Sequence, residues 1–324
     1  MIALSNINKT FRVAKRQAGF GRAVKALFSR EYELIHALND ISFTISDGEM
    51  VGYIGPNGAG KSTTIKIMCG ILTPDSGTCN IDGRTPWKER VAHVREIGVV
   101  FGQRSQLWWD VPIIDSFELI RDIYKADEKI YRNSLDELTE LLDLSELLKT
   151  PARSLSLGQR MRCEIAASLL HSPKTLFLDE PTIGLDAVSK IAVRQFIKKL
   201  NTEHGTTVIL TTHDMQDIEA LTGRILLIGK GRILLDGSLA ELKKRSSERK
   251  TLVIEHNGTA PDISEGMTLT EIKEGRLVIT LDPSILPVSG AITSLAAQTE
   301  LTDVSVSDIT AEEMVALLYK EYDI

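Results

Sequence analysis

The chain has 324 residues, which is enough for two domains and a buried core. Hydrophobic residues make up 43% and charged residues 25%, a balance that excludes a disordered or fibrous protein. The net charge of −6 and the aromatic content of 5% argue against a general nucleic-acid-binding protein, although the first thirty residues hold seven Lys or Arg and no acid.

The cysteines and the hydropathy give no sign of secretion or of a membrane span. Cys69, Cys79 and Cys163 lie far apart without a CxxC pair, which is typical of a reducing compartment. The N-terminus turns from apolar to basic, the reverse of a secretory signal. The longest uncharged run, 283–299, is too polar to lie in lipid. We therefore expect a water-soluble chain that can still lie against a membrane.

The first 236 residues predict an α/β domain. Strands are expected at 2–7 and 41–45, with a basic stretch at 12–30 between them. Short apolar runs then alternate with helical patterns, as in a parallel sheet wrapped by helices. These runs are VGYI (51–54), IGVVF (97–101), TLFL (175–178) and TVILTT (207–212). A helical period over 114–149 predicts a helical subdomain at about 104–172.

A predicted hairpin over 224–235, turning at Gly229–Gly231, closes this first domain. Residues 237–324 predict a small α+β domain without a chemical motif. Its expected strands are TLVIEH (251–256), RLVITL (276–281) and VSVSDI (304–309), and its expected helices are 287–298 and 311–322.

The sequence GPNGAGKS at 55–62 directly follows a predicted strand and satisfies the pattern G-x-x-x-x-G-K-[ST]. Gly55, Gly58 and Gly60 allow backbone N–H groups to converge on a polyphosphate at the start of a helix. Lys61 would reach the β- and γ-phosphates, and the Ser62 hydroxyl would bind Mg²⁺. The alternative is a glycine-rich turn that ends in a helix cap.

Polar residues follow the other three apolar runs at their carboxyl ends, where ligands bind in open α/β sheets. Asp179 would hold Mg²⁺ together with Ser62, and Glu180 would orient or deprotonate the attacking water. His213 would contact the γ-phosphate, and the Gln103 amide would bind the metal or the water. The alternatives are a capping or ion-paired Glu180 and a structural His213.

These motifs resemble, in order and spacing, those of ATP-binding cassette (ABC) ATPases. The six matching elements are GPNGAGKST (55–63), Gln103, LSLGQ (155–159), LFLDEP (176–181), GLD (184–186) and His213. The resemblance covers about residues 1–235. It implies a P-loop ATPase with a parallel core sheet, an antiparallel β-subdomain and a helical insertion, followed by the small α+β domain.

LSLGQ resembles the signature LSGGQ of this family, with Leu157 where the pattern has Gly. By this resemblance Ser156, Gly158 and Gln159 begin a helix whose N–H groups touch the γ-phosphate that a second copy holds. Asp186 matches the loop that links the two sites across the dimer.

The resemblance implies ATP and Mg²⁺ as cofactors, and an aromatic ring from the early β-region against adenine. Phe11 is the first candidate for this ring and Tyr32 the second. The complete set expected to bind ATP is Phe11, Gly55, Pro56, Asn57, Gly58, Ala59, Gly60, Lys61, Ser62, Thr63, Ser156, Gly158, Gln159 and Asp186.

The resemblance also implies an ATP-hydrolysing subunit of a membrane transporter, most similar to exporter-type cassettes. It would form a homodimer around two ATP molecules and lie on the cytoplasmic face of the membrane against separate permease subunits. One of Trp108 and Trp109 would pack in the core while the other is exposed for the permease. The basic amphipathic stretch at 12–30 would pack on the cassette or contact the membrane. The alternative function is a soluble ABC-type ATPase that remodels a protein or ribonucleoprotein complex.

Overall fold

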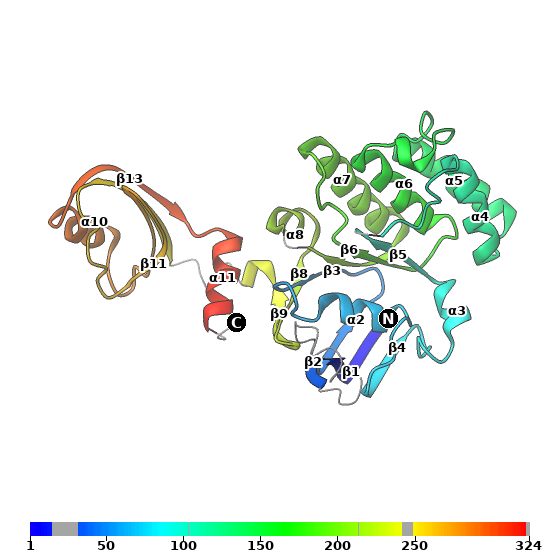
Figure 1. The fold of residues 1–324 in the computed structure, drawn as a ribbon, viewed down its shortest axis with the longest axis horizontal. Coiled ribbons are helices and arrows are strands. Elements are labelled where there is room, and N and C mark those ends of the chain that lie inside the picture. Colours follow the sequence, from blue (N-terminus) through cyan, green and yellow to red (C-terminus); the bar gives the residue numbers. More distant parts are fainter. Residues whose placement is uncertain (15–31, 103, 213, 242–248, 322–324) are drawn as a thin grey trace, which may run out of the picture. The chain divides into compact units, whose positions relative to one another are not determined.

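The computed structural model describes residues 1–14, 32–102, 104–212, 214–241 and 249–321 (Figure 1). These residues divide into two compact units, Met1–Asp236 and Gly237–Ile324. Gln103, His213 and most of the basic stretch at 12–30 lie outside the described residues. The roles expected for the two side chains, and the membrane contact expected for the stretch, therefore stay predictions.

A six-stranded sheet lies at the centre of the first unit, with the order β5-β6-β7-β3-β8-β9. Its strands are β3 (Met50–Ile54), β5 (Ile97–Phe101), β6 (Thr175–Asp179), β7 (Thr207–Thr211), β8 (Arg224–Gly229) and β9 (Arg232–Ser238). The ladders that join β5 to β6, β6 to β7, β7 to β3 and β3 to β8 are parallel. The four apolar runs therefore form the predicted parallel core sheet, buried on both faces.

Helices cover both faces of this sheet, with α6 and α7 on one side and α2 on the other (Figure 1). They are α2 (Lys61–Met68), α3 (Arg90–Val94), α4 (Ile113–Tyr124), α5 (Glu128–Leu141), α6 (Leu157–Leu169), α7 (Ala187–His204) and α8 (Met215–Leu221). The helices α4 to α6 form the helical insertion that the sequence predicts.

A three-stranded antiparallel sheet with the order β2-β1-β4 lies below α2 (Figure 1). Its strands are β1 (Ile2–Ala14), β2 (Tyr32–Ile45) and β4 (Ser76–Ile81). The first two strands are longer than the predicted 2–7 and 41–45. Pairing continues from Ile2↔Ile45 to Ala14↔Tyr32, so the added residues gain backbone hydrogen bonds although most of their side chains are exposed. The apolar alternation at 41–45 found most of the buried residues of β2 and missed Leu38, which is buried as well.

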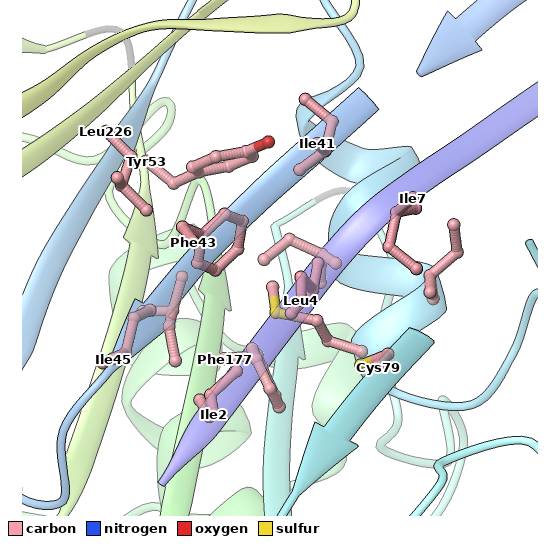
Figure 2. Packing of buried hydrophobic residues seen from close by; sticks show 14 of the residues in the cluster. Ile2, Leu4, Ile7, Ile41, Phe43, Ile45, Tyr53, Cys79, Phe177 and Leu226 are labelled. Atoms are coloured by element: carbon pink, nitrogen blue, oxygen red, sulfur yellow. The ribbon is translucent and has the colours of Figure 1, made fainter. Parts of the chain in front are cut away.

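The core of the first unit lies between the two sheets and surrounds α2. Leu4 and Phe43 from the antiparallel sheet pack there with Tyr53 and Phe177 from the parallel sheet (Figure 2). The rings of Phe43 and Tyr53 lie 5.9 Å apart between centroids. The Tyr53 hydroxyl also shares a buried hydrogen bond of 3.0 Å with Thr64 Oγ1 in α2. This contact ties α2 to β3 on either side of the loop at 55–60.

The second unit is a four-stranded antiparallel sheet with the order β11-β12-β10-β13. Its elements are β10 (Lys250–Asn257), β11 (Met267–Lys273), β12 (Arg276–Leu281), α10 (Val288–Ala296), β13 (Glu300–Asp308) and α11 (Ala311–Glu321). Leu252, Ile254 and Ile279 pack there against Leu295 of α10. The strand β11 was not predicted, because a register shift between Leu269 and Glu271 breaks its alternation.

Within the described part of the chain, no helix combines the length and the apolar character that crossing a membrane requires.

We propose that 1–236 and 237–324 are separate domains, since each contains a hydrophobic cluster of its own. A chain that ends at Asp236 should therefore fold and give one cooperative transition in differential scanning calorimetry. A chain that ends at Ser238 keeps the whole of β9 and is the matched control. A fragment without near-UV circular dichroism or a cooperative transition would show that the first unit needs the second.

Candidate nucleotide-binding site

The loop between β3 and α2 has the geometry of an anion-binding turn. Gly60 is the N-cap of α2 with φ of 113°, and a Cβ atom there would lie 2.6 Å from the carbonyl oxygen of Ala37. Gly60 provides no side-chain cap, so the first N–H groups of α2 can bind an external acceptor. The positive end of the helix dipole lies at the same place. The loop at 55–63 can therefore bind a phosphate group.

Lys61 folds back over this loop. Its side chain is buried, and Nζ donates hydrogen bonds to the carbonyl oxygens of Gly55 at 2.6 Å and Pro56 at 3.2 Å. Burial lowers the pKa of Lys61, while the nearby carboxylates of Glu180 and Asp179 raise it. A buried ammonium group beside the phosphate loop has a polyphosphate as its natural counter-ion.

Ser62 and Asp179 come together although 117 residues separate them in the chain. Ser62 lies in the first turn of α2, Asp179 ends β6, and the Ser62 hydroxyl donates to Asp179 Oδ2 at 3.1 Å. A hydroxyl and a carboxylate are the oxygen ligands that Mg²⁺ takes from proteins alongside phosphate and water. Among the described residues, no group of three or more His, Cys, Asp and Glu could hold a metal by itself. The pair therefore fits Mg²⁺ that arrives with a phosphate.

Glu180 lies next to this pair in an uncommon backbone conformation, with φ of 56°. Its N–H donates to Thr211 O at 2.9 Å and to Thr211 Oγ1 at 3.2 Å, which holds the turn against the end of β7. The N-cap of α7 is Asp186, so helix capping does not account for Glu180. A left-handed non-glycine residue is strained, and such residues concentrate at functional sites.

These groups line one pocket of about 840 Å³. The phosphate loop and the first turns of α2 line it, together with residues 35–37 of β2. The other lining residues include Phe101, Gly102, Arg104, Asp179 and Glu180. Arg104 and residues 35–37 carry no motif and were not predicted from the sequence. The pocket can hold a nucleoside triphosphate with its phosphates on the loop.

Neither predicted aromatic residue lines this pocket. Phe11 pairs with Ile35, which does line it, so cross-strand pairing places the Phe11 side chain beside the pocket wall. Tyr32 is 48% exposed, and the Arg12 guanidinium lies 5.3 Å from the centre of its ring. The contact between Phe11 and adenine stays a prediction.

The segment that resembles the family signature forms the start of α6. Ser156 is its N-cap and accepts a hydrogen bond from Gln159 N at 3.2 Å, while Gln159 Oε1 accepts one from Ser156 N at 2.9 Å. A Cβ atom at Gly158 would lie 2.4 Å from Ser189 Oγ, so a larger residue there would have to displace the Ser189 side chain. The helix begins where the resemblance implies.

Asp186 lies at this same place, at the N-cap of α7. It accepts hydrogen bonds from Ser189 N and Ser189 Oγ, both at 2.9 Å, and these bonds lower the pKa of its carboxyl group. None of Ser156, Gly158, Gln159 and Asp186 lines the pocket described above. The two motif segments therefore form a second cluster apart from the phosphate loop.

A buried carboxylate joins the chain after β5 to α6. Glu164 is 5% exposed and accepts hydrogen bonds from the Ser105 hydroxyl and from Gln106 N at 3.1 Å. The side-chain amide of Gln106 donates to the backbone carbonyl oxygen of Glu164 at 2.9 Å. Burial raises the pKa of Glu164, against the effect of the hydrogen bond from Ser105. The segment that leaves the pocket is thus fixed to the helix that begins at the signature.

Comparison with known proteins agrees with this site. The family model described as ABC transporter matches residues 38–183. The uncharacterized ABC transporter ATP-binding protein YhcH of Bacillus subtilis (strain 168) is 34% identical over 197 residues, which are 61% of this chain and 63% of YhcH. The match thus spans less than two thirds of YhcH.

A second relative is the daunorubicin resistance ATP-binding protein DrrA3 of Streptomyces coeruleorubidus, 33% identical over 223 residues, which are 68% of this chain and 70% of DrrA3. Among solved structures, the dimeric post-hydrolysis state of the ATP-binding cassette MJ0796 bound to ADP and Pi matches with a TM-score of 0.61 at 28% identity. That match covers 74% of this chain and 99% of the other.

The raised pKa of Glu164 predicts a pH-dependent cost of keeping this carboxyl buried. The protonated Glu164 carboxyl stabilises the folded state in full below its ordinary pKa of 4.5. This stabilisation is lost as the pH rises through the higher pKa of the folded state. Glu164→Gln, which carries no charge at any pH, should therefore gain melting temperature relative to the parent between pH 4.5 and 8. The gain should grow as the pH rises and then level off once the parent carboxyl is ionised in the folded state.

Thermal melts of both proteins across this pH range measure the difference. Glu118→Gln removes an exposed carboxylate of α4 and controls for the change in net charge. A constant difference between parent and Glu164→Gln from pH 4.5 to 8 would show that the buried carboxyl carries no such cost.

Proposed function

Because the chain belongs to the family of ABC transporter ATP-binding proteins, we propose that it is the ATP-hydrolysing subunit of a membrane exporter. The observation that supports this most directly is the meeting of the loop at 55–63 with Asp179 and Glu180 in one pocket. We place the protein at the cytoplasmic face of the membrane, as a peripheral subunit on separate permease chains. DrrA3, a drug-resistance protein by name, supports transport outward.

In this proposal the loop at 55–63 and Lys61 hold the triphosphate of ATP. Ser62 and Asp179 would hold Mg²⁺, which when bound neutralises charge on the phosphate oxygens. Glu180 would orient the attacking water and accept its proton, which requires a carboxylate close to the γ-phosphate. Gln103 and His213 would complete the contacts to the water and the γ-phosphate, as the sequence resemblance implies.

We further propose that two copies share each nucleotide. Ser156, Gly158, Gln159 and Asp186 cluster away from the pocket of their own chain, so their contact with a γ-phosphate requires a second molecule. The solved MJ0796 cassette, described as dimeric with ADP and Pi, is similar to this chain. A homodimer would pair each phosphate loop with the signature of the other copy.

The permease would contact the segment after β5 and the outer side of α4. Trp108 and Trp109 are 41% and 51% exposed, and Leu119 and Ile123 of α4 are 40% and 59% exposed. The prediction that one of the two tryptophans packs in the core is wrong, because both are exposed. Exposed apolar side chains this close in the chain are typical of a protein interface. This placement favours a transporter subunit over a soluble remodelling ATPase.

The roles of Glu180 and Lys61 predict different defects. Glu180→Gln should bind ATP and Mg²⁺ as the parent does but lower turnover by about 100-fold or more, because the amide cannot accept a proton. It should also accumulate an ATP-bound dimer, visible by size-exclusion chromatography. Lys61→Ala should instead weaken ATP binding by about 10-fold or more, because a charge-assisted contact is lost. Turnover of Glu180→Gln at the parent rate would contradict the role of Glu180.

The proposed permease contact predicts a selective loss of assembly. The double variant Leu119→Glu/Ile123→Glu places two charges on an exposed apolar surface, where substitutions change folding stability by less than about 0.5 kcal/mol. Its basal ATP hydrolysis should stay at the parent level, while its recovery with permease-containing membranes should fall by about 10-fold. Ile272→Glu changes an equally exposed residue in the other unit and is the matched control. Equal recovery of all three proteins would exclude this surface.

A further inference from the structure

Thr211 is the last residue of β7, which the sequence predicts as a buried strand. The structure places it opposite Asp179, its register partner at the end of β6. The side chain is completely buried. Its hydroxyl Oγ1 lies 2.5 Å from Asp179 Oδ1 and 3.2 Å from the backbone nitrogen of Glu180. One hydroxyl therefore contacts both neighbouring residues of the site.

The direction of these two hydrogen bonds follows from their chemistry. The N–H of Glu180 can only donate, so Thr211 Oγ1 accepts that bond. The hydroxyl proton is then available for Asp179 Oδ1, which as a carboxylate oxygen can only accept. The other oxygen of the same carboxylate, Oδ2, accepts from the Ser62 hydroxyl. Oδ1 is thus held from β7, and Oδ2 faces α2 and the phosphate loop.

The fold by itself does not require a hydroxyl at this position. The preceding residues of β7, Val208, Ile209 and Leu210, are apolar and buried, and a β-branched apolar side chain would fill the same space. A buried hydroxyl is costly unless it is hydrogen-bonded. At the other end of the strand, the Thr207 hydroxyl accepts a bond from Gly48 N at 2.9 Å, a contact with the β2–β3 turn. The Thr211 hydroxyl, by contrast, contacts the site.

We propose that Thr211 is a positioning residue, whose hydroxyl orients the Asp179 carboxylate toward Mg²⁺, while its backbone carbonyl accepts the shorter bond from Glu180 N, at 2.9 Å. This inference rests on the proposed function, in which Asp179 holds the metal. Without the hydroxyl, Oδ1 loses its donor and the carboxylate can rotate away from Ser62. Residues that orient a metal ligand in this way typically change metal affinity or activity by about 10- to 100-fold.

The test compares the affinity of the full chain for a fluorescent ATP analogue with Mg²⁺ and with EDTA. Thr211→Val keeps the β-branched shape and removes the hydroxyl. It should lower the Mg²⁺-dependent gain in affinity by about 10-fold or more and leave the affinity in EDTA unchanged. Thr211→Ser restores the hydroxyl and should lie within about 3-fold of the parent. Electron paramagnetic resonance should likewise show that the nucleotide complex of Thr211→Val binds Mn²⁺ more weakly than the complexes of the parent and of Thr211→Ser.

Thr207→Val is the matched control, because it removes a buried hydroxyl from the same strand away from the site. It should lose thermal stability to a similar extent without any change in Mg²⁺ dependence. If Thr211→Val does not fold, Thr211→Ala carries the same test, since it removes the hydroxyl without adding a methyl group.

Asp179→Asn separates this inference from the proposed function on which it rests. If Asp179→Asn loses the Mg²⁺-dependent gain while Thr211→Val keeps the parent value, Thr211 has no positioning role and the metal site stands. If parent and Asp179→Asn respond equally to Mg²⁺, the proposed metal site itself is wrong. Equal losses for Thr211→Val and Thr211→Ser would also overturn the inference, because they would assign the effect to packing.

Discussion

The site depends on the parallel register of β3, β6 and β7. This register brings the carboxyl ends of the three strands to one edge of the sheet, where Asp179 and Thr211 are direct partners. The loop that leaves β3 then returns through α2, and Ser62 meets Asp179 from the other side. If β6 slipped by one residue against β7, every side chain of β6 would move to the opposite face of the sheet. The Asp179 carboxylate would then leave the pocket. The buried apolar residues that fix this register therefore determine the chemistry as well.

Buried carboxylates fix the loops that leave this edge. Asp217 of α8 is completely buried and accepts hydrogen bonds from Arg194 Nε at 2.5 Å, from Thr212 Oγ1 at 3.2 Å and from the Thr182 hydroxyl. The loops after β6 and β7 are thus tied to α7 through one side chain. Glu164 does the same for the segment after β5. Removing one partner of a buried ion pair strongly destabilises a protein, so Arg194 and Asp217 depend on each other for the stability of this region.

The sequence was sufficient for the parts of the site that form locally or that follow a buried strand. The phosphate loop and the parallel sheet were predicted because glycine positions and apolar runs each act over a few residues, and the start of α6 was predicted from the resemblance of LSLGQ to the family signature. The roles of Thr211 and Glu164 were not predicted, because each depends on a hydrogen bond to a residue far away in the sequence. The partner of Thr211 is 32 positions away and that of Glu164 is 59 positions away. The full length of β1 and β2 was also missed, because pairing rather than burial stabilises their outer parts.

Leu157, which stands where the signature pattern has glycine, is compatible with anion binding at α6. The capping box uses the N–H groups of Ser156 and Gln159, and it leaves those of Leu157 and Gly158 for an external acceptor. The Leu157 side chain extends toward Gly184, where a Cβ atom would lie 2.9 Å from Leu157 Cδ2. Gly184 has φ of 71° and no side chain, so it provides the space that the larger residue needs. The Leu157 side chain thus lies partly against Gly184, on the side of the loop that precedes Asp186, and remains 36% exposed.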